Sequence, residues 1–262
     1  MRILIRTSKS AIWSRRFGSL ALPLMVLPVF LHRERLISST DFVVVEAVAM
    51  AVAALALGLA VTAFARLWVT GDQGWGKATL GLLFSLICLV PLAGYVWQAT
   101  RFPAVAEVTT DFARPPGLVS QLPERTLTAE DRAAVEAAFP NARTRAYPVE
   151  AARLYALLNQ LIEERDWEVR ARREPQTPLA EGQVNAVATT LLGWRDEVAI
   201  RIQGTPEGSV VAMRSAALHG GHDLGSNGRR VESFLAALDE RITTLLRETP
   251  TAQPANEEPE AT

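Results

Sequence analysis

The sequence predicts an α+β fold, with transmembrane helices at the N-terminal end, then an antiparallel sheet with two amphipathic helices packed on one face. Two observations lead to this expectation. Apolar residues form three long runs within the first hundred positions, whereas most Asp, Glu, Lys and Arg residues come later. The later part alternates strand-like and helix-like hydrophobic patterns, with several strand patterns in succession, and this order is typical of α+β domains.

The second and third apolar runs, 42–65 and 78–97, reach the roughly 20 residues that a helix needs to cross a bilayer. The third run ends in Tyr95 and Trp97, which suit a membrane–water boundary. We expect both runs to be transmembrane helices.

The first run, 17–31, is shorter and contains Pro23 and Pro28. Basic residues precede it, so a cleaved signal peptide is an alternative to a retained helix. The sequence HRERL follows the run directly, where a signal peptide would have small residues at its cleavage site. This favours a retained helix and a membrane region over 1–100.

The distribution of basic residues predicts the orientation in the membrane, because cytoplasmic segments carry an excess of Lys and Arg. Five basic residues precede the first run, and Arg66 and Lys77 flank the second loop. We expect a multi-pass protein of the bacterial inner membrane with a cytoplasmic N-terminus. Everything after about residue 100 would then be periplasmic, also if the first run were a cleaved signal.

The segment 101–126 is rich in Pro and shows no sustained period, so we expect an extended linker lying close to the membrane. An α+β domain is expected over 127–248. It opens with a short helix over 127–139, for which Thr128 and Asp131 form a variant of the capping box. The tail 249–262, rich in Pro, Glu and Ala, is expected to be disordered.

Within the domain, hydrophobic periodicity predicts a short strand and a helix, then four strands and a closing helix. Val198, Ile200 and Ile202 alternate with polar or small residues and so define a half-buried strand. The predicted ranges are 144–150 and 149–166 for the first strand and helix, 167–173, 182–192, 195–203 and 209–218 for the other strands, and a closing helix that includes 231–245.

Three blocks lie in order over residues 101–240, namely FPAVAEVTTDFARPPGL, ATTLLGWRDEVAIRI and MRSAALHGGHDLGSNGRRVESFLAAL. They resemble the bacterial family known as domain of unknown function 1499, whose membrane-anchored members have a similar helical front. The resemblance implies no activity, since the family has none assigned. The family's recurring residue types fall on Arg214, Ser215, Gly220, Asp223, Gly225, Asn227 and Arg230, and His219 and His222 lie outside this signature.

The stretch HGGHDLGSNGRRV (219–231) allows three interpretations. As a turn and helix cap, Gly220, Gly221 and Gly225 permit positive φ, Asp223 accepts backbone N–H bonds, and Ser226 or Asn227 caps the helix. As an active site, His219, His222 and Asp223 would bind a metal or act as acid and base, but zinc needs three or four ligands. As an anion site, the loop would offer backbone N–H groups assisted by Arg229 or Arg230. We favour the turn and cap, in which Arg230 also pairs with Asp223.

A basic sheet face is the other candidate surface. If Val198 and Ile202 face the helices, Arg201 faces away, and the same alternation places Arg170 and Arg172 outward, with Arg214 as a further candidate. Beside a membrane such a face would meet anionic lipid headgroups. The alternative, which we favour, is a solvated face balanced by Glu168 and Glu197, because charges of mixed sign screen each other.

The sequence therefore favours a non-catalytic domain that binds a protein or anionic lipid partner, without a cofactor or a metal. The net charge of −1 gives no indication of a nucleic-acid partner. Two other classes stay open: a hydrolase or metal-dependent enzyme that uses the 219–230 loop, and a carrier of lipids or small molecules.

Overall fold

The structure is a computed structural model that describes residues 6–122 and 127–248. The chain divides into two compact units. Unit 1 contains the chain up to Ala106 together with residues 189–196 and 217–225, and unit 2 contains the rest. The tail predicted over 249–262 lies outside the described residues.

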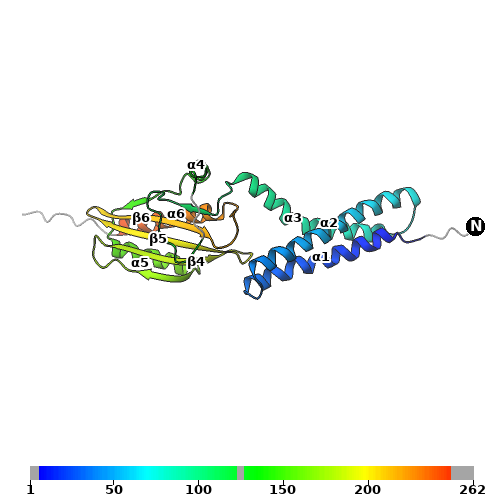
Figure 1. The fold of residues 1–262 in the computed structure, drawn as a ribbon, viewed down its shortest axis with the longest axis horizontal. Coiled ribbons are helices and arrows are strands. Elements are labelled where there is room, and N and C mark those ends of the chain that lie inside the picture. Colours follow the sequence, from blue (N-terminus) through cyan, green and yellow to red (C-terminus); the bar gives the residue numbers. More distant parts are fainter. Residues whose placement is uncertain (1–5, 123–126, 249–262) are drawn as a thin grey trace, which may run out of the picture. The chain divides into compact units, whose positions relative to one another are not determined.

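Within the described residues, unit 1 has three helices that are long and apolar enough to cross a membrane (Figure 1). They are α1 (Lys9–Arg33), α2 (Ser39–Thr70) and α3 (Trp75–Arg101), and each contains one of the predicted apolar runs. Pro23 and Pro28 lie inside α1. Membrane helices tolerate proline because neighbouring groups satisfy the freed carbonyls.

The helices of unit 1 contact one another through small side chains, which let the backbones approach closely. Ser14 of α1 donates a hydrogen bond to the carbonyl of Ala56 in α2 (2.9 Å). A Cβ atom placed on Gly81 of α3 would lie 2.7 Å from the carbonyl carbon of Ser14. The buried small residues are Ala11, Ser14, Gly18 and Ala21 in α1, Ala49, Ala53, Ala56, Ala60 and Ala63 in α2, and Ala78, Gly81, Ser85 and Cys88 in α3.

His32 joins the end of α1 to two other segments of unit 1. Its Nδ1 lies 2.8 Å from the carbonyl oxygen of Leu192, and its Nε2 lies 3.0 Å from Oγ of Ser39. The ring stacks on Phe42 and meets the edge of Trp194 at 5.1 Å between centroids. This histidine is therefore a buried structural residue, held by two hydrogen bonds.

The described strands of unit 2 form one antiparallel sheet in the order β1-β6-β5-β4-β3, with β2 also paired to β6. Arg214–Ala216 of β6 pair with β1, and Ser209–Val211 pair with β2, so both short strands flank the same edge. The elements are β1 (Glu107–Thr109), α4 (Ala129–Ala138), β2 (Arg145–Tyr147), α5 (Ala151–Glu164), β3 (Glu168–Arg173), β4 (Glu181–Thr189), β5 (Arg195–Thr205), β6 (Gly208–Ala217) and α6 (Ser226–Glu248). Thr128 caps α4 in a complete capping box with Asp131, as predicted.

The core of unit 2 lies between one sheet face and the helices α5 and α6. Trp167, just before β3, stacks on Phe234 of α6 at 5.3 Å between ring centroids. The apolar stripes of both helices are buried, as are the alternate residues of β5 and β6 that face them. These buried residues are Leu154, Leu158, Ile162, Val198, Ile200, Ile202, Val211, Met213, Phe234, Leu235, Leu238 and Ile242.

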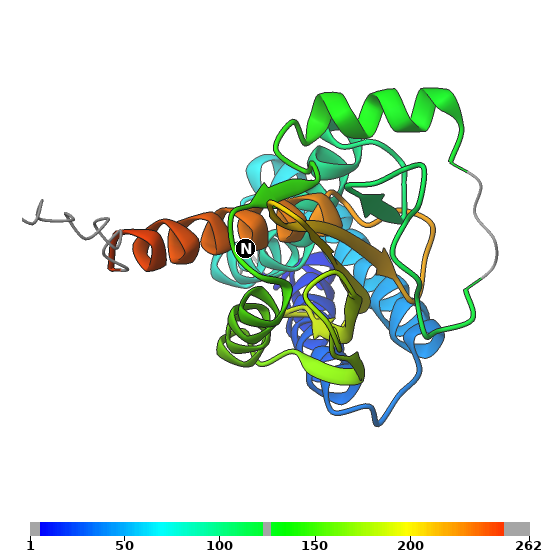
Figure 2. The same cartoon turned by 90° about the vertical axis from the view of Figure 1, so that its left-hand side faces the viewer.

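The structure differs from the expected linker over 101–126. Residues 107–109 form the edge strand β1, and residues 110–120, here called the covering segment, run over the sheet on the side away from α5 (Figure 2). This short strand lies in a Pro-rich stretch without a sustained period, which is the pattern of a linker, so the sequence pattern alone did not reveal it.

A β-bulge in β3 corrects the expected direction of Arg172. Val169 pairs with Ala186 but Ala171 pairs with Asn185, so Arg170 is an extra residue in the ladder. Beyond the bulge the alternation is reversed, because one inserted residue exchanges the two faces. Arg172 therefore lies opposite Val184 on the helix side and pairs with Glu163 of α5 (3.4 Å).

Candidate functional site

The sheet face opposite α5 and α6 carries a group of charged and polar side chains. Glu197 and Arg201 alternate along β5 with the core residues Val198, Ile200 and Ile202, and so project from the other face. Asn185 of β4 and Arg214 of β6 lie on this same face, since Asn185 bonds to Glu197 and Arg214 is paired in register with Thr109. The covering segment lies over this group, which we call the polar face.

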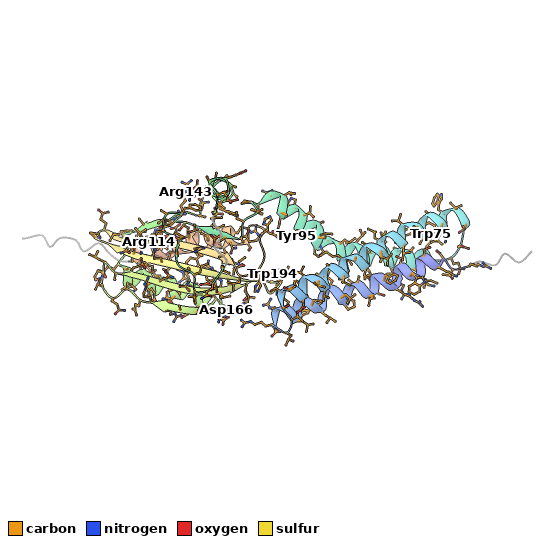
Figure 3. All side chains as sticks on the ribbon, viewed as in Figure 1. Trp75, Tyr95, Arg114, Arg143, Asp166 and Trp194 are labelled. Carbon is orange, nitrogen blue, oxygen red and sulfur yellow. The ribbon has the colours of Figure 1, made fainter. Side chains whose placement is uncertain are left out.

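Arg201 is held at both ends of its guanidinium group. Its Nη2 donates to the Asp111 carboxylate (2.7 Å) and its Nη1 donates to the carbonyl of Arg114 (2.6 Å). The same carboxylate accepts the backbone N–H groups of Ala113 and Arg114, which closes a turn at the start of the covering segment; the Arg114 side chain is labelled in Figure 3. Burial alone would raise the pKa of Asp111, but these hydrogen bonds and the Arg201 charge lower it below its usual value.

Glu197 binds the other end of the covering segment. The backbone N–H groups of Val119 (2.6 Å) and Ser120 (2.9 Å) donate to its two carboxylate oxygens, and Asn185 Nδ2 donates as well (2.9 Å). Glu197 is 0% exposed. Burial tends to raise the pKa of this carboxyl, but the hydrogen bonds outweigh burial and lower it. Asn185 also donates to the carbonyl of Gly117 (2.8 Å).

Arg214 pairs with Glu107 of β1 (2.6 Å), and its Nη1 lies 3.5 Å from the carbonyl oxygen of Pro116. Arg201 and Arg214 thus lie on the predicted face, but they are paired and covered. They do not form the open basic surface that was one interpretation of this face, and the face is not the solvated one that we favoured either, since Glu197 is buried. Arg170 is exposed and pairs with Glu168 (3.1 Å). Glu107, Asp111 and Asn185 were not expected here; the available signal was the two acidic residues, which with Arg114 are the charged residues between Arg101 and Glu124.

The loop 219–225 forms a tight turn within unit 1. Gly220 (φ 84°), Leu224 (φ 54°) and Gly225 (φ 75°) have left-handed backbone conformations. The Asp223 carboxylate accepts the Gly225 N–H (2.9 Å), and the Asp223 N–H donates to the carbonyl of Val105 (3.1 Å). His222 Nδ1 accepts the Leu224 N–H (3.1 Å).

Ser215, Asn227 and Arg230 meet on the helix side of β6. The Ser215 hydroxyl donates to Oδ1 of Asn227 (2.7 Å), and Arg230 Nη1 donates to both Oδ1 of Asn227 (2.6 Å) and Oγ of Ser215 (3.0 Å). Ser215 and Asn227 are fully buried. α6 begins at Ser226, and the printed side-chain bonds of Asn227 join it to β6 and to Arg230, so a helix cap by Ser226 or Asn227 stays a prediction. An Asp223–Arg230 pair stays a prediction.

The sequence of the chain matches one known family. The model of a family described as a protein of unknown function (DUF1499) matches residues 107–238, which is half of the chain. The chain belongs to the DUF1499 family. The match begins at the first residue of β1, so the covering segment is part of the DUF1499 domain.

The other comparisons add little to this DUF1499 assignment. No curated protein matches the chain. The chain is similar to a solved structure titled as the di-domain ARO/CYC StfQ from the steffimycin biosynthetic pathway, with 13% identity and a TM-score of 0.20. The similarity covers 66% of this chain and 60% of that one, so the chain spans less than two thirds of that protein's length. A TM-score this low supports no conclusion about fold or activity.

The two histidines of the loop 219–225 differ in their surroundings. His219 is exposed, whereas His222 is partly buried and used by the turn. Among residues 6–122 and 127–248, no three His, Cys, Asp or Glu side chains are grouped so that they could hold a metal ion.

A groove of about 470 Å³ runs along α6 of the DUF1499 domain. Its charged groups have both signs: Arg145 and Arg229, and Glu232 and Asp239. Asp239 accepts the Tyr147 hydroxyl (2.6 Å) and lies 3.5 Å from Nε of Arg145. Burial, and then this hydrogen bond, raise the pKa of Tyr147, so its phenol stays protonated at neutral pH. The groove is therefore a polar surface with charges of both signs.

Proposed function

We propose that this DUF1499 protein is an integral protein of the bacterial inner membrane that holds its α+β domain on the periplasmic side. The helices α1, α2 and α3 would act as the anchor, with the N-terminus in the cytoplasm. The basic residues support this orientation. Arg6, Lys9, Arg15, Arg16, Arg66 and Lys77 lie near one end of the helices, whereas Arg33, Arg35 and Arg101 lie near the other.

We further propose that the domain binds a partner and performs no chemistry of its own. The observation that carries this proposal is the use of its polar side chains. Glu197 and Arg201 hold the covering segment, and Ser215, Asn227 and Arg230 bind one another. Groups engaged in this way maintain the fold, and a nucleophile would need an oriented base beside it.

The α6 groove is the surface that we assign to the partner, a protein segment with charges of both signs. Unlike the covered polar face, the groove is open and its Ser233 and Ala236 are exposed. The charged side chains that line the groove would contribute more to the specificity of binding than to its affinity. An anionic lipid is the other partner class, and the covered position of Arg201 and Arg214 makes it the weaker choice for this domain.

Topology is the first test. Two reporters, one active only outside the cytoplasm and one active only inside, are fused separately after Glu248. The proposal expects signal only from the outside reporter. Signal only from the inside reporter would show that the domain is cytoplasmic and would refute the periplasmic assignment.

A photoreactive residue tests the groove in intact cells. It is placed at Ala236, which lines the groove, and at Ala152 of α5 as a control, since both alanines are exposed on helices of unit 2. We expect a defined cross-linked product from position 236 only. Equal labelling at both positions would remove the groove as the partner surface.

Replacing His219 and His222 together with alanine separates a binding domain from an enzyme. A binding domain should keep its fold and its ability to rescue a deletion strain. Loss of rescue by a folded double variant would support chemistry in this loop.

A further inference from the structure

A second cavity, of about 340 Å³, lies in unit 1 at the end of the helices where α1 and α3 begin. Its walls include side chains of both helices and of the loop before α3. The residues that matter for its chemistry are Thr7, Arg15, Gln73, Trp75, Lys77 and Leu80.

Backbone hydrogen bonds fix the wall of this cavity. The Ser8 N–H donates to the carbonyl of Gln73 (2.9 Å), and the Gln73 N–H donates to the carbonyl of Arg6 (3.1 Å). These bonds form a parallel bridge between Thr7 and Gln73. Gly74 then turns into α3 with φ 141°, a conformation that suits glycine. The loop is therefore held against the start of α1.

Two cations from different helices share the cavity. Arg15 comes from α1 and Lys77 from α3. Within the described part of the chain, neither side chain forms an ion pair or a hydrogen bond to another side chain. Both side chains carry a positive charge, and like charges that line one cavity repel each other, so an anion between them would reduce that repulsion.

The same cavity has an apolar side. Leu80 lies one helical turn after Lys77, and Trp75, labelled in Figure 3, packs near Phe64 with 5.6 Å between ring centroids. Trp75 and Leu80 are 46% and 38% exposed, although both are large and apolar. A cationic pair next to exposed apolar side chains matches a ligand with an anionic head and a hydrocarbon tail.

We propose that this cavity binds the phosphate headgroup of an anionic phospholipid, with Arg15 and Lys77 contacting the phosphate and Leu80 contacting the first part of an acyl chain. The proposal rests on the membrane insertion stated above. The ends of spanning helices lie among lipid headgroups, and tryptophan favours that layer. A free phosphate ion would use the same two cations, but it would leave Trp75 and Leu80 exposed.

Native mass spectrometry of the full chain in detergent tests the proposal. Phosphatidylglycerol and phosphatidylcholine are added at equal concentration. The test variant is Arg15→Gln with Lys77→Gln. The control is Arg16→Gln with Arg66→Gln, which removes the same charge near the same end of the helices but outside the cavity.

We expect the parent and the control to retain phosphatidylglycerol in preference to phosphatidylcholine. The test variant should retain it at least tenfold more weakly, on the order expected for two basic contacts. A third variant, Arg15→Lys with Lys77→Arg, should keep binding, and it serves as the comparison if the first variant fails to fold.

Three results would overturn the proposal: equal losses in the test and control variants, undiminished binding by the folded test variant, or displacement of the lipid by millimolar inorganic phosphate. The last result would assign the cavity to free phosphate. Because lipid binding in detergent does not depend on orientation, the reporter fusions can fail while this experiment succeeds, and the reverse.

Discussion

At the scale of single residues, the polar face shows why buried charges are retained in this domain. An isolated buried charge costs several kcal/mol, and removal of one partner from a buried pair is strongly destabilising. Glu197 and Arg201 each bond to backbone groups that lie more than seventy residues away in sequence. The two side chains therefore fix the path of the covering segment.

Replacing Glu197 with Gln should lower the free energy of unfolding at pH 7 by about 2 kcal/mol, since hydrogen bonds to a charged group are lost. Because the pKa of Glu197 is lowered in the folded protein, its contribution to stability decreases as the pH falls. The carboxylate's contribution is fully present above the ordinary value of 4.5 and disappears as the pH falls through the lower folded value. Urea unfolding of the full chain in detergent, from pH 7 to pH 3, measures the gap between parent and variant. A gap that stays constant down to pH 3 would contradict this account.

Two polar residues of the 219–231 stretch should differ in their effect on stability. Asp223→Ala removes an acceptor from a turn and should cost on the order of 1 kcal/mol. Asn227→Ala removes the buried acceptor shared by Ser215 and Arg230 and should cost about 2 kcal/mol. Thermal unfolding of both variants beside the parent tests the order. Equal unfolding of Asp223→Ala and the parent would reject the structural role of the turn.

At the scale of elements, the periodicity of apolar residues determined which helices and strands could be predicted from the sequence. The helices of both units and the strands β4, β5 and β6 are long enough to show a period, and each was expected near its observed position. β1 was missed because it lies in the Pro-rich segment 101–126, whose composition indicates a linker, whereas the equally short β2 was expected within 144–150. The bulge at Arg170 was missed because an inserted residue shows itself only in the pairing with β4.

The candidate site was predictable in part for a related reason. Alternation along β5 placed Arg201 on the correct face, yet nothing local indicates that a segment some ninety residues earlier covers it. Likewise, the turn chemistry of Gly220, Asp223 and Gly225 follows from local rules. The bond between Asn227 and Ser215 is tertiary and could not be read from sequence.

Helix packing in unit 1 offers a matched pair of glycine substitutions within α3. A Cβ at Gly81 would lie 2.7 Å from Ser14 and 2.8 Å from the Arg15 nitrogen, both backbone atoms, whereas a Cβ at Gly94 meets nothing within 4 Å. We expect Gly81→Ala to destabilise the helices by about 1–3 kcal/mol through overpacking. Gly94→Ala should be neutral or slightly stabilising. Thermal unfolding in detergent compares them, and equal melting temperatures would show that the close α1–α3 contact is not limiting.

At the scale of the whole molecule, the two units are stabilised by different kinds of side-chain packing. Unit 1 packs through alanine, glycine and serine, which suits a medium where apolar side chains gain nothing by leaving the lipid. Unit 2 has a core of larger apolar residues and a covered polar face, which suits water. The change in composition along the sequence is therefore compatible with a lipid environment for the helices of unit 1 and an aqueous one for unit 2.

The orientation of the helices in the membrane should depend on the basic residues at their ends. Replacing Arg6, Lys9, Arg15 and Arg16 with Gln should reduce the basic bias at the N-terminal end and move part of the population to the inverted topology. The paired reporters after Glu248 would then give signal from the inside reporter where the parent gives none. Replacing four exposed basic residues of the domain, Arg143, Arg153, Arg229 and Arg247, is the control and should leave the outside signal unchanged, since they lie far along the chain from the helices. An unchanged topology in the first variant would mean that Arg66 and Lys77 are sufficient to orient the helices. Replacing Arg66 and Lys77 as well, in the same variant, tests this.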